Sequence, residues 1–251
     1  MDVKQTSSFT SEYIQRIRQF LNSRDDTNVE LAFFIMKGNG APRELYKTLC
    51  TGKKALLCLE HGFYDIVKEV QSLDWEDCDL QELPPDLHYL QNLRELYLEY
   101  NQLHFIPSSL QYLTKLRELN LSENFLQYIP QQIGFLTQME ELKLSGNQLT
   151  SLPPQIGQLT QLQYIGLSNN RITRLPKEFK KLTNLEYIGF SNNELTQLPE
   201  EIYHLPRLKK ITLYGNHFTH SEIKKINRYL PNTYVRFRWF WIIRMVMLFK
   251  I

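Results

Sequence analysis

The sequence predicts a right-handed α/β solenoid, a horseshoe arc with a parallel sheet on its concave face and an all-helical N-terminal cap. Two observations predict it. One apolar phrase returns every 23 residues from Val70 to Leu230, and the residues before it lack that period but contain short amphipathic stretches. A period of about 20 to 50 residues is typical of proteins in which each copy buries its apolar face only against its neighbours. The chain therefore divides into a helical cap at 1–69, seven repeats at 70–230, and a capping strand with a hydrophobic tail at 231–251.

The predicted N-terminal cap contains four or five short helices. Residues 10–22 carry apolar side chains at helical spacing. Thr27–Glu30 has the pattern of a capping box, which predicts a second helix over 29–37 that ends at a glycine. Pro42 suits the first position of a third helix that runs to Thr51, and 55–70 is apolar enough for one or two more. This region is either a cap on the first repeat or a small independent docking domain.

Each repeat opens with an apolar residue followed by a short alternating segment, which predicts a strand with its fourth and sixth residues facing the core. A proline stands fourteen residues after the opening residue in six of the seven copies. The opening residues are Val70, Leu93, Leu116, Met139, Leu162, Leu185 and Leu208, and the prolines are Pro84, Pro107, Pro130, Pro153, Pro176 and Pro199. The apolar residues that follow each proline are expected to line the convex side and close each coil.

The ninth residue of each copy is an asparagine, replaced by cysteine in the first copy. A side-chain amide at the end of a strand can bond backbone groups that would otherwise be buried without partners. Stacked copies would form a ladder of such amides, with the thiol as a weaker donor in the same slot. The predicted structural ladder is Cys78, Asn101, Asn124, Asn147, Asn170, Asn193 and Asn216.

The phrase Leu-x-x-Leu-x-Leu-x-x-Asn/Cys-x-Leu resembles that of leucine-rich repeat proteins. The second half of the repeat, for example Leu152-Pro153 followed by Ile156 and Leu159, resembles the 23-residue class found in Ras-group intracellular proteins and in many bacterial ones. The resemblance implies a cytoplasmic scaffold that binds other proteins. In the Ras-group branch the partners are small GTPases or their regulators, but no residue in this sequence identifies such a partner.

The C-terminal part is predicted to close the stack. Residues 221–229 suit a helix and 230–237 a strand, a combination that resembles the closing cap of bacterial members of this class. Eleven of the 14 residues in 238–251 are apolar or aromatic, too few to span a bilayer as a helix. Apolar residues at alternate positions predict a further edge strand there, a site for self-association. A membrane-surface contact and out-of-frame, non-native sequence are the alternatives.

The overall charge and the first residues exclude some classes of protein. Lys and Arg number 29 and Asp and Glu 27, a net charge of +2, so the basic excess of a nucleic-acid binder is missing. Residues 1–20 contain no apolar stretch like that of a secretory signal, and the three cysteines include no close pair. These features predict a cytoplasmic protein without nucleic-acid partners.

Catalytic and metal-binding motifs are weak in this sequence. It lacks a phosphate-binding loop, a nucleophile elbow and a zinc-protease motif. His217 and His220 could share a metal only with a third ligand from elsewhere, and nothing orients His61 as a base for Cys58. We therefore expect a protein that is not an enzyme and that holds no metal or cofactor.

The third, fifth, seventh and eighth residues of each repeat are predicted to face the hollow of the arc. These rows change from acidic, through an uncharged floor of Tyr and Gly, to mildly basic. A tyrosine beside a glycine suggests a shallow depression for a partner's side chain, and an acidic rim favours a basic partner. The predicted contact residues are Tyr97, Glu99, Tyr100, Glu118, Glu141, Tyr164, Tyr187 and Tyr214. The hypothesis is a protein or peptide ligand on the concave face, and the alternative is a membrane-surface or self-associating protein that acts through 238–251.

Overall fold

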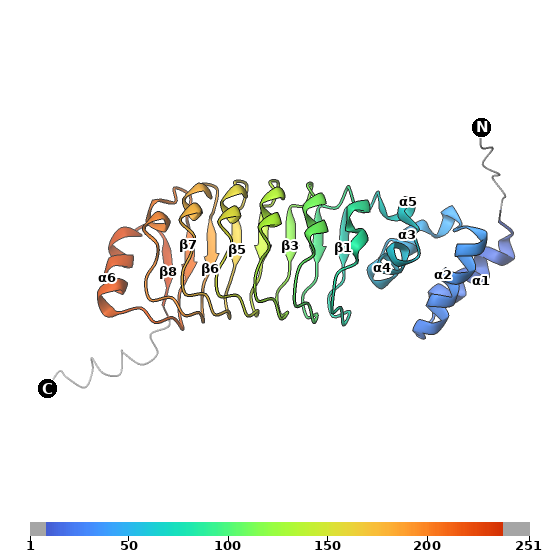
Figure 1. Cartoon of the computed structure of the whole chain (residues 1–251), viewed down its shortest axis with the longest axis horizontal. Coiled ribbons are helices and arrows are strands. Elements are labelled where there is room, and N and C mark those ends of the chain that lie inside the picture. The colour runs from blue at the N-terminus through green and yellow to red at the C-terminus, as the bar shows by residue number, and fades with distance from the viewer. Residues whose placement is uncertain (1–8, 238–251) are drawn as a thin grey trace.

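The computed structural model describes residues 9–237 of the 251-residue chain. Eight short strands form one parallel sheet in chain order (Figure 1). The strands are β1 (Ser72–Asp74), β2 (Glu95–Tyr97), β3 (Glu118–Asn120), β4 (Glu141–Lys143), β5 (Tyr164–Gly166), β6 (Tyr187–Gly189), β7 (Lys210–Thr212) and β8 (Tyr234–Arg236). From β1 to β7 each strand pairs with the next in a register of 23 residues, such as Leu96 with Leu119. This arrangement confirms the predicted α/β solenoid.

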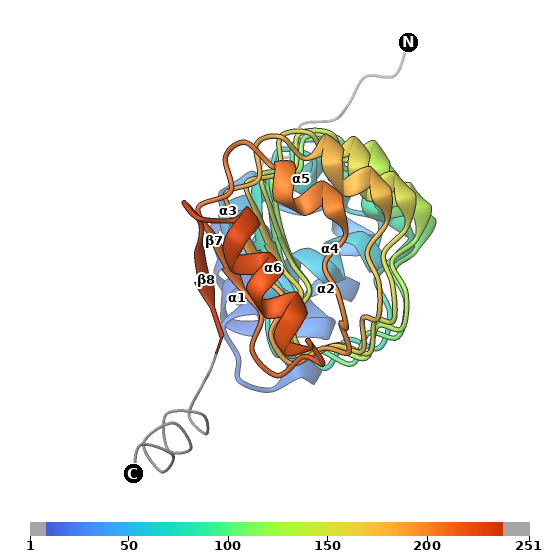
Figure 2. The same ribbon diagram turned by 90° about the vertical axis from the view of Figure 1, so that its left-hand side faces the viewer.

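A single turn of 3-10 helix follows each repeat proline and lies away from the strands (Figure 2). These turns are η2 (Pro85–Tyr89), η3 (Ser108–Tyr112), η4 (Gln131–Phe135), η5 (Pro154–Gln158), η6 (Lys177–Lys181) and η7 (Glu200–His204). The fixed φ of proline suits the extended residue that precedes such a turn. Each turn also buries one apolar residue, namely Leu87, Leu110, Ile133, Ile156, Phe179 or Ile202. The core therefore lies between the strands and these turns, as the pattern predicted.

The helices before the sheet are α1 (Ser11–Leu21), α2 (Asp26–Asn39), α3 (Tyr46–Leu49), α4 (Gly52–Glu60) and α5 (Tyr64–Val67), with a 3-10 turn η1 (Arg43–Leu45) before α3. Thr10 caps α1 by accepting a hydrogen bond from the Tyr13 amide at 3.2 Å. The sequence placed the start of α2 too late: Asp25 is the cap, and its carboxylate accepts from the Thr27 amide at 3.0 Å. An ionised carboxylate on an N-terminal amide is a strong cap, and the helix runs on to Asn39 because Gly40, with a φ of +88°, is where the backbone turns.

The third predicted helix is shorter than expected. Pro42 precedes the η1 turn in extended conformation, and α3 ends at Leu49 rather than at Thr51. The next helix then packs on the first repeat. Trp75, the largest fully buried side chain, donates its indole N–H to the Gly52 carbonyl at 2.8 Å. This bond ties the start of α4 to the residue after β1.

The last helix within the described residues, α6 (His220–Tyr229), lies across the C-terminal end of the coil (Figure 2). Its cap is Thr219, which accepts from the Glu222 amide at 3.2 Å, and its buried residue is Ile226. The strand β8 then pairs with β7, so that helix and strand together close the stack as predicted. The strand, membrane contact or non-native sequence predicted at 238–251 lies outside the described residues.

Candidate functional site

A ladder of buried asparagine amides fixes the end of each strand. The Nδ2 group of Asn147 donates to the carbonyls of Leu121 at 2.9 Å and Leu144 at 3.1 Å, and its Oδ1 accepts from the Leu126 amide at 2.9 Å. Each amide thus joins its own repeat to the one before it, and equivalent bonds occur at Asn101, Asn124, Asn170, Asn193 and Asn216. The thiol of Cys78 instead donates to the Glu76 carbonyl at 3.3 Å, within its own copy.

The residue before each ladder position adopts a left-handed backbone conformation in all seven copies. These residues are Asp77, Tyr100, Glu123, Gly146, Asn169, Asn192 and Gly215, with φ between +51° and +70°. Glycine and asparagine tolerate this conformation, whereas a bulky residue is strained in it. Asn169 is therefore more than a solubilising residue, because alanine would be strained at its φ of +56°. It also accepts a hydrogen bond from Asn192 at 2.7 Å.

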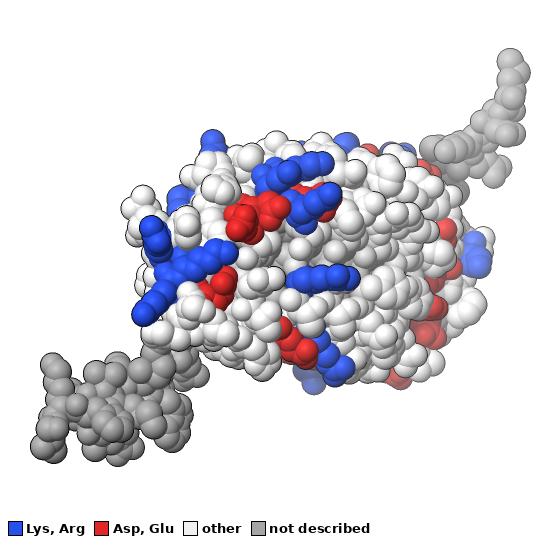
Figure 3. All heavy atoms as spheres, turned by 60° about the vertical axis from the view of Figure 1, so that its left-hand side comes forward, with Lys and Arg blue, Asp and Glu red and all other residues white. Residues whose placement is uncertain are grey.

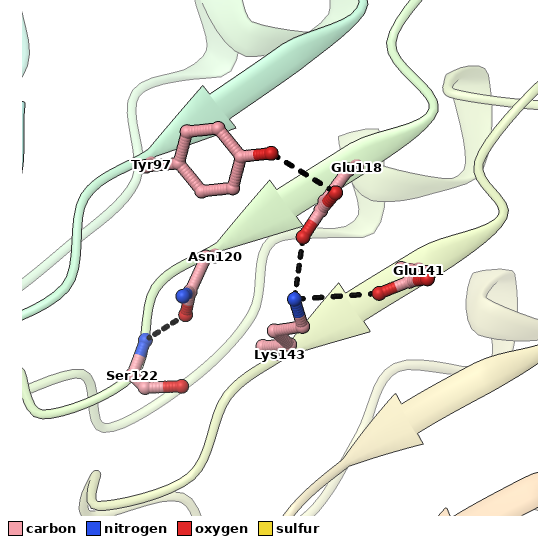
Figure 4. Close-up of polar contacts among 6 residues, drawn as sticks. All are labelled: Tyr97, Glu118, Asn120, Ser122, Glu141 and Lys143. Atoms are coloured by element: carbon pink, nitrogen blue, oxygen red, sulfur yellow. Dashed lines mark hydrogen bonds and ion pairs between the residues drawn. The ribbon is translucent and has the colours of Figure 1, made fainter. Parts of the chain in front are cut away.

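The side chains of β2, β3 and β4 that point away from the core form one polar network (Figure 4). The solvent-facing side of the sheet, predicted to be concave, is called the sheet face. On it, the Tyr97 hydroxyl donates to Oε2 of Glu118 at 3.1 Å, and Lys143 bonds the other oxygen of that carboxylate. Lys143 also lies 3.3 Å from Glu141. The side chain of Asn120 bonds within its own repeat, where its Oδ1 accepts a hydrogen bond from the Ser122 amide at 3.1 Å.

The network shifts the protonation of its members. Burial, together with the charge of Glu118 and its hydrogen bond, raises the pKa of Tyr97 to about 12. Burial alone would lower the pKa of Lys143, but the hydrogen bonds and charges of Glu118 and Glu141 outweigh it, and the pKa is raised. Lys143 is therefore a stable cation that neutralises part of the predicted acidic row.

A second group of carboxylates lies at the ends of β1 and β2. One oxygen of Glu99, Oε2, is buried, and within residues 9–237 it has no hydrogen-bond partner. Burial, followed by the nearby charges of Glu76 and Asp74, raises the pKa of Glu99. This end of the sheet face thus holds several carboxylates close enough together to affect one another.

Two tyrosines stack on one another in the centre of the sheet. The rings of Tyr164 on β5 and Tyr187 on β6 are parallel within 4°, with centroids 4.6 Å apart. The ammonium of Lys210 on β7 lies 5.2 Å from the centroid of the Tyr187 ring and 6.0 Å from that of Tyr234. The ammonium of Lys210 therefore extends the tyrosine stack and lies between two aromatic rings.

The depression predicted beside these tyrosines is filled. A methyl group placed on Gly166 would lie 3.2 Å from Cε1 of Tyr164, and one on Gly189 would lie 3.4 Å from Cε1 of Tyr187. Each ring therefore leans over the glycine two residues further along its own strand, and both glycines are buried. The glycines make room for the rings rather than for a partner.

The repeats of this chain match those of known proteins. A family model described as leucine rich repeat matches residues 68–126, 116–172, 137–189 and 160–218, which together span more than half of the chain. The chain belongs to the leucine-rich repeat family. Among solved structures, the leucine-rich repeat protein LIC12759 of Leptospira interrogans is similar, with 27% sequence identity and a TM-score of 0.41 over 74% of this chain and 57% of that one. The present chain thus spans less than two thirds of that protein's length. A search of curated proteins found no match.

The leucine-rich repeat framework brings some predicted contact residues together and separates others. Tyr97, Glu118 and Glu141 share the polar network, and Tyr164 and Tyr187 share the stack. Three inter-strand spacings separate β2 from β5, a distance of about 14 Å. Tyr100 is 59% exposed at the end of its strand, and Tyr214 lies under the guanidinium of Arg236, whose Cζ is 6.0 Å from the ring centroid.

Sequence reasoning missed the two lysines that organise this leucine-rich repeat surface. Lys143 and Lys210 stand in the predicted solvent-facing rows, but neither was expected to be a contact residue. The signal was the register itself. Lys143 lies one strand from Glu118 and Lys210 one strand from Tyr187, so each is next to a group that attracts a cation.

The weaker catalytic candidates find no support in this leucine-rich repeat protein. The thiol of Cys58 is fully buried and donates to the Leu49 carbonyl at 3.6 Å, and burial raises its pKa. The ring of His61 packs between Phe33 and Phe34. Across residues 9–237 no three His, Cys, Asp or Glu side chains are grouped as a metal site requires. In the same part of the chain, no helix has both the length and the apolarity that crossing a membrane would require.

Proposed function

We propose that this chain is a non-catalytic scaffold of the cytoplasm that binds a protein or peptide partner on its sheet face. The observation that supports the proposal is the contrast between the buried positions of the repeat and the positions that face the solvent. The core positions stay apolar in all seven repeats and the ladder position is an amide in six of them, whereas the third position reads Ser72, Glu95, Glu118, Glu141, Tyr164, Tyr187 and Lys210. Folding does not require this variation, so a ligand is its best explanation.

The partner would meet two different surfaces. The carboxylates of Asp74, Glu76 and Glu99 favour a basic side chain, since they lie close enough together for their charges to interact. The stacked rings of Tyr164 and Tyr187 offer rigid aromatic area, the kind of residue enriched at binding hot spots. We propose that Tyr97, Glu99, Tyr100, Glu118, Glu141, Tyr164, Tyr187 and Tyr214 contact the partner, with Lys143 holding two of the carboxylates in place.

The division of the chain is part of the same proposal. Residues 1–69 would cap the apolar end of the first repeat, residues 70–230 would present the binding rows, and residues 231–237 would close the other end. The indole of Trp75 bonded to Gly52 and the Tyr64 ring stacked on Tyr89 at 3.6 Å support a capping role for the helices. An independent docking domain would not need to be joined to the repeats in this way.

Affinity capture from native lysate with mass spectrometry would test the binding surface. The bait carrying Tyr164→Ala and Tyr187→Ala should lose the partner, because each hot-spot tyrosine is worth at least ~2 kcal/mol, about 30-fold in affinity. The matched control is Tyr112→Ala with Tyr128→Ala, two tyrosines that are each 57% exposed and lie outside the sheet-face rows.

The partner identified in this way is then measured with purified proteins. Raising the salt concentration should slow its association if the acidic end attracts it. A partner that both double variants retain, or that the control alone loses, would contradict the proposed surface.

A further inference from the structure

Charge on the sheet face is divided between its two ends. The third, fifth, seventh and eighth positions of the first four repeats carry eight carboxylates and a single cation, Lys143. The same positions of the last three repeats carry no carboxylate and one cation, Lys210, and β8 adds Arg236 beside them. The eight carboxylates are Asp74, Glu76, Asp77, Glu95, Glu99, Glu118, Glu123 and Glu141. One surface therefore has an acidic half and a basic end, although the whole chain has a net charge of only +2.

The basic end of the sheet face is built from β6, β7 and β8. In the register of the sheet Lys210 lies between Tyr187 and Tyr234, and its ammonium is 5.2 Å and 6.0 Å from their ring centroids. Arg236, two residues after Tyr234, has its guanidinium carbon 6.0 Å from the ring centroid of Tyr214. With ordinary strand spacings the backbones of the two cations are about 8 Å apart. Three tyrosine rings therefore accompany two neighbouring cations on the sheet face.

Neither cation has a carboxylate partner among the described residues. The ion pairs of this part of the chain involve neither Lys210 nor Arg236, whereas the neighbouring Lys209 pairs with Glu186 at 2.6 Å. The sequence of 238–251 contains no Asp or Glu either. An aromatic ring attracts a cation but leaves its charge uncompensated, because the ring has no net charge. The basic end is thus suited to a carboxylate that a partner supplies.

The acidic half is neutralised only in part. Lys143 pairs with Glu118 in the middle of this half. Further along, Asp74, Glu76 and Glu99 take part in no ion pair of the described residues. Charge complementarity at the two ends of one surface therefore requires cations on one part of the partner and an anion on another.

We propose that the partner contacts the sheet face with an extended segment of opposite polarity, its basic side chains over β1 to β4 and an acidic side chain between Lys210 and Arg236. This inference rests on the proposed function, because it names the chemistry of the partner bound there. The strands β2 and β7, which carry Glu95 and Lys210 in the same row, are five inter-strand spacings or about 24 Å apart. About seven residues of extended chain span that distance and would cross the stacked rings of Tyr164 and Tyr187. The two charged ends therefore fix the direction in which the segment lies.

Selection of displayed random peptides of about 12 residues, long enough to reach both ends, on the immobilised full chain tests this inference. Enriched peptides should contain Asp or Glu about seven residues away from a group of Lys or Arg. The best of them, made as a synthetic peptide, should bind Lys210→Gln/Arg236→Gln at least about tenfold more weakly, because a hydrogen bond to a charged group is commonly worth that much. Replacing the acidic residue of the peptide by its amide should weaken binding to the native chain equally, and should change binding to the variant very little.

A matched control removes two cations that lie on α6 rather than on a strand. Figure 3 shows that Lys and Arg side chains also gather at the C-terminal end of the coil, which α6 crosses. Lys224 and Arg228 are exposed on this helix, and Arg228 also has its guanidinium carbon 5.9 Å from the ring centroid of Tyr229. Lys224→Gln/Arg228→Gln should therefore leave peptide binding unchanged. Equal thermal unfolding of the two double variants and the native chain would establish that they fold.

Three outcomes would overturn the inference. The enriched peptides could lack the acidic residue, the α6 control could weaken binding as much as Lys210→Gln/Arg236→Gln, or no peptide could be enriched. Peptides that lack the acidic residue but are lost with Tyr164→Ala/Tyr187→Ala would leave the proposed function in place. Peptides whose acidic residue depends on Lys210 and Arg236, but that bind the tyrosine variant normally, would support the inference and contradict the proposed tyrosine contacts. A failure of one proposal can therefore be distinguished from a failure of the other.

Discussion

The sheet face has two halves that share a backbone but differ in how their side chains are held. On β2 to β4, charged and hydroxyl groups form a connected network around Lys143, whereas on β5 and β6 two tyrosine rings stack over glycines. The ladder amides beneath both halves make the same bonds. The comparison teaches that the buried rows fix the geometry of the repeat, and that the exposed rows are then free to carry different chemistry.

The two halves also differ at the left-handed residue that ends each strand. After β2, β3 and β4 these residues are Tyr100, Glu123 and Gly146, and after β5 and β6 they are Asn169 and Asn192. Left-handed backbone costs an ordinary residue roughly 1–2 kcal/mol, which asparagine reduces and glycine avoids. Tyr100 and Glu123 in the first half therefore carry more strain than Asn169 and Asn192 in the second, and the Tyr100 ring is exposed.

The largest expected effect tests whether the ladder is common to both halves. Asn124→Ala and Asn193→Ala should each lower the free energy of unfolding by about 1–3 kcal/mol, because each leaves a buried amide and buried carbonyls without partners. Both asparagines are 4% exposed. Urea unfolding of the two variants measures this, with Asn169→Gly as a control that suits the left-handed backbone. A difference of more than about 1 kcal/mol between the two alanine variants would show that the ladder does not support both halves equally.

The next expected effect is a difference in stability between losing a largely covered ion pair and losing an exposed one. Lys143→Met should lower the free energy of unfolding by about 1–2 kcal/mol, because Glu118 loses a charged partner where both side chains are largely covered, at 30% and 21% exposed. Lys209→Met removes a pair whose side chains are 70% and 37% exposed, and should cost less than about 1 kcal/mol. Unfolding at low and high salt measures both. Equal costs would show that the network adds nothing beyond an ordinary surface pair.

A smaller effect of opposite sign concerns the strained tyrosine. Tyr100→Gly should raise the free energy of unfolding by about 0.5–1 kcal/mol, since relief of the left-handed strain exceeds the entropy that glycine adds to the unfolded chain. The same variant should bind the partner more weakly. Thermal unfolding and a binding titration measure the two consequences. A loss of stability would mean that the Tyr100 ring supports the fold rather than a ligand.

The smallest effect appears only in alkali. A pKa of about 12 for Tyr97, above the ordinary value of 10.0, means that the folded protein holds the proton more tightly than the unfolded chain. The contribution to stability is therefore complete below pH 10 and is lost as the pH rises through about 12. Phenolate absorbance of the wild type minus that of Tyr97→Phe measures this titration. Glu118→Gln should move it to lower pH, and an unmoved titration would mean that burial alone causes the shift.

Much of the fold could be predicted from the sequence because the same residue pattern occurs in seven copies. The 23-residue spacing identified the strands, the convex apolar residues and the ladder, and the resemblance to bacterial members identified the closing helix and strand. Features that occur only once in the sequence were predicted less accurately. The start of α2 was misplaced because Asp25 and Thr27 both look like caps, and only the backbone decides which carboxylate or hydroxyl reaches a free amide.

The sequence was enough to identify the apolar residues that form the core, since apolar periodicity and burial have the same physical cause. The contacts between exposed side chains became visible only in three dimensions: Lys143 joins two glutamates, and the tyrosine rings cover Gly166 and Gly189. These contacts join residues 23 or more positions apart or depend on rotamers and local dihedral angles. A one-dimensional pattern contains the spacing of such residues but not the direction in which their side chains point.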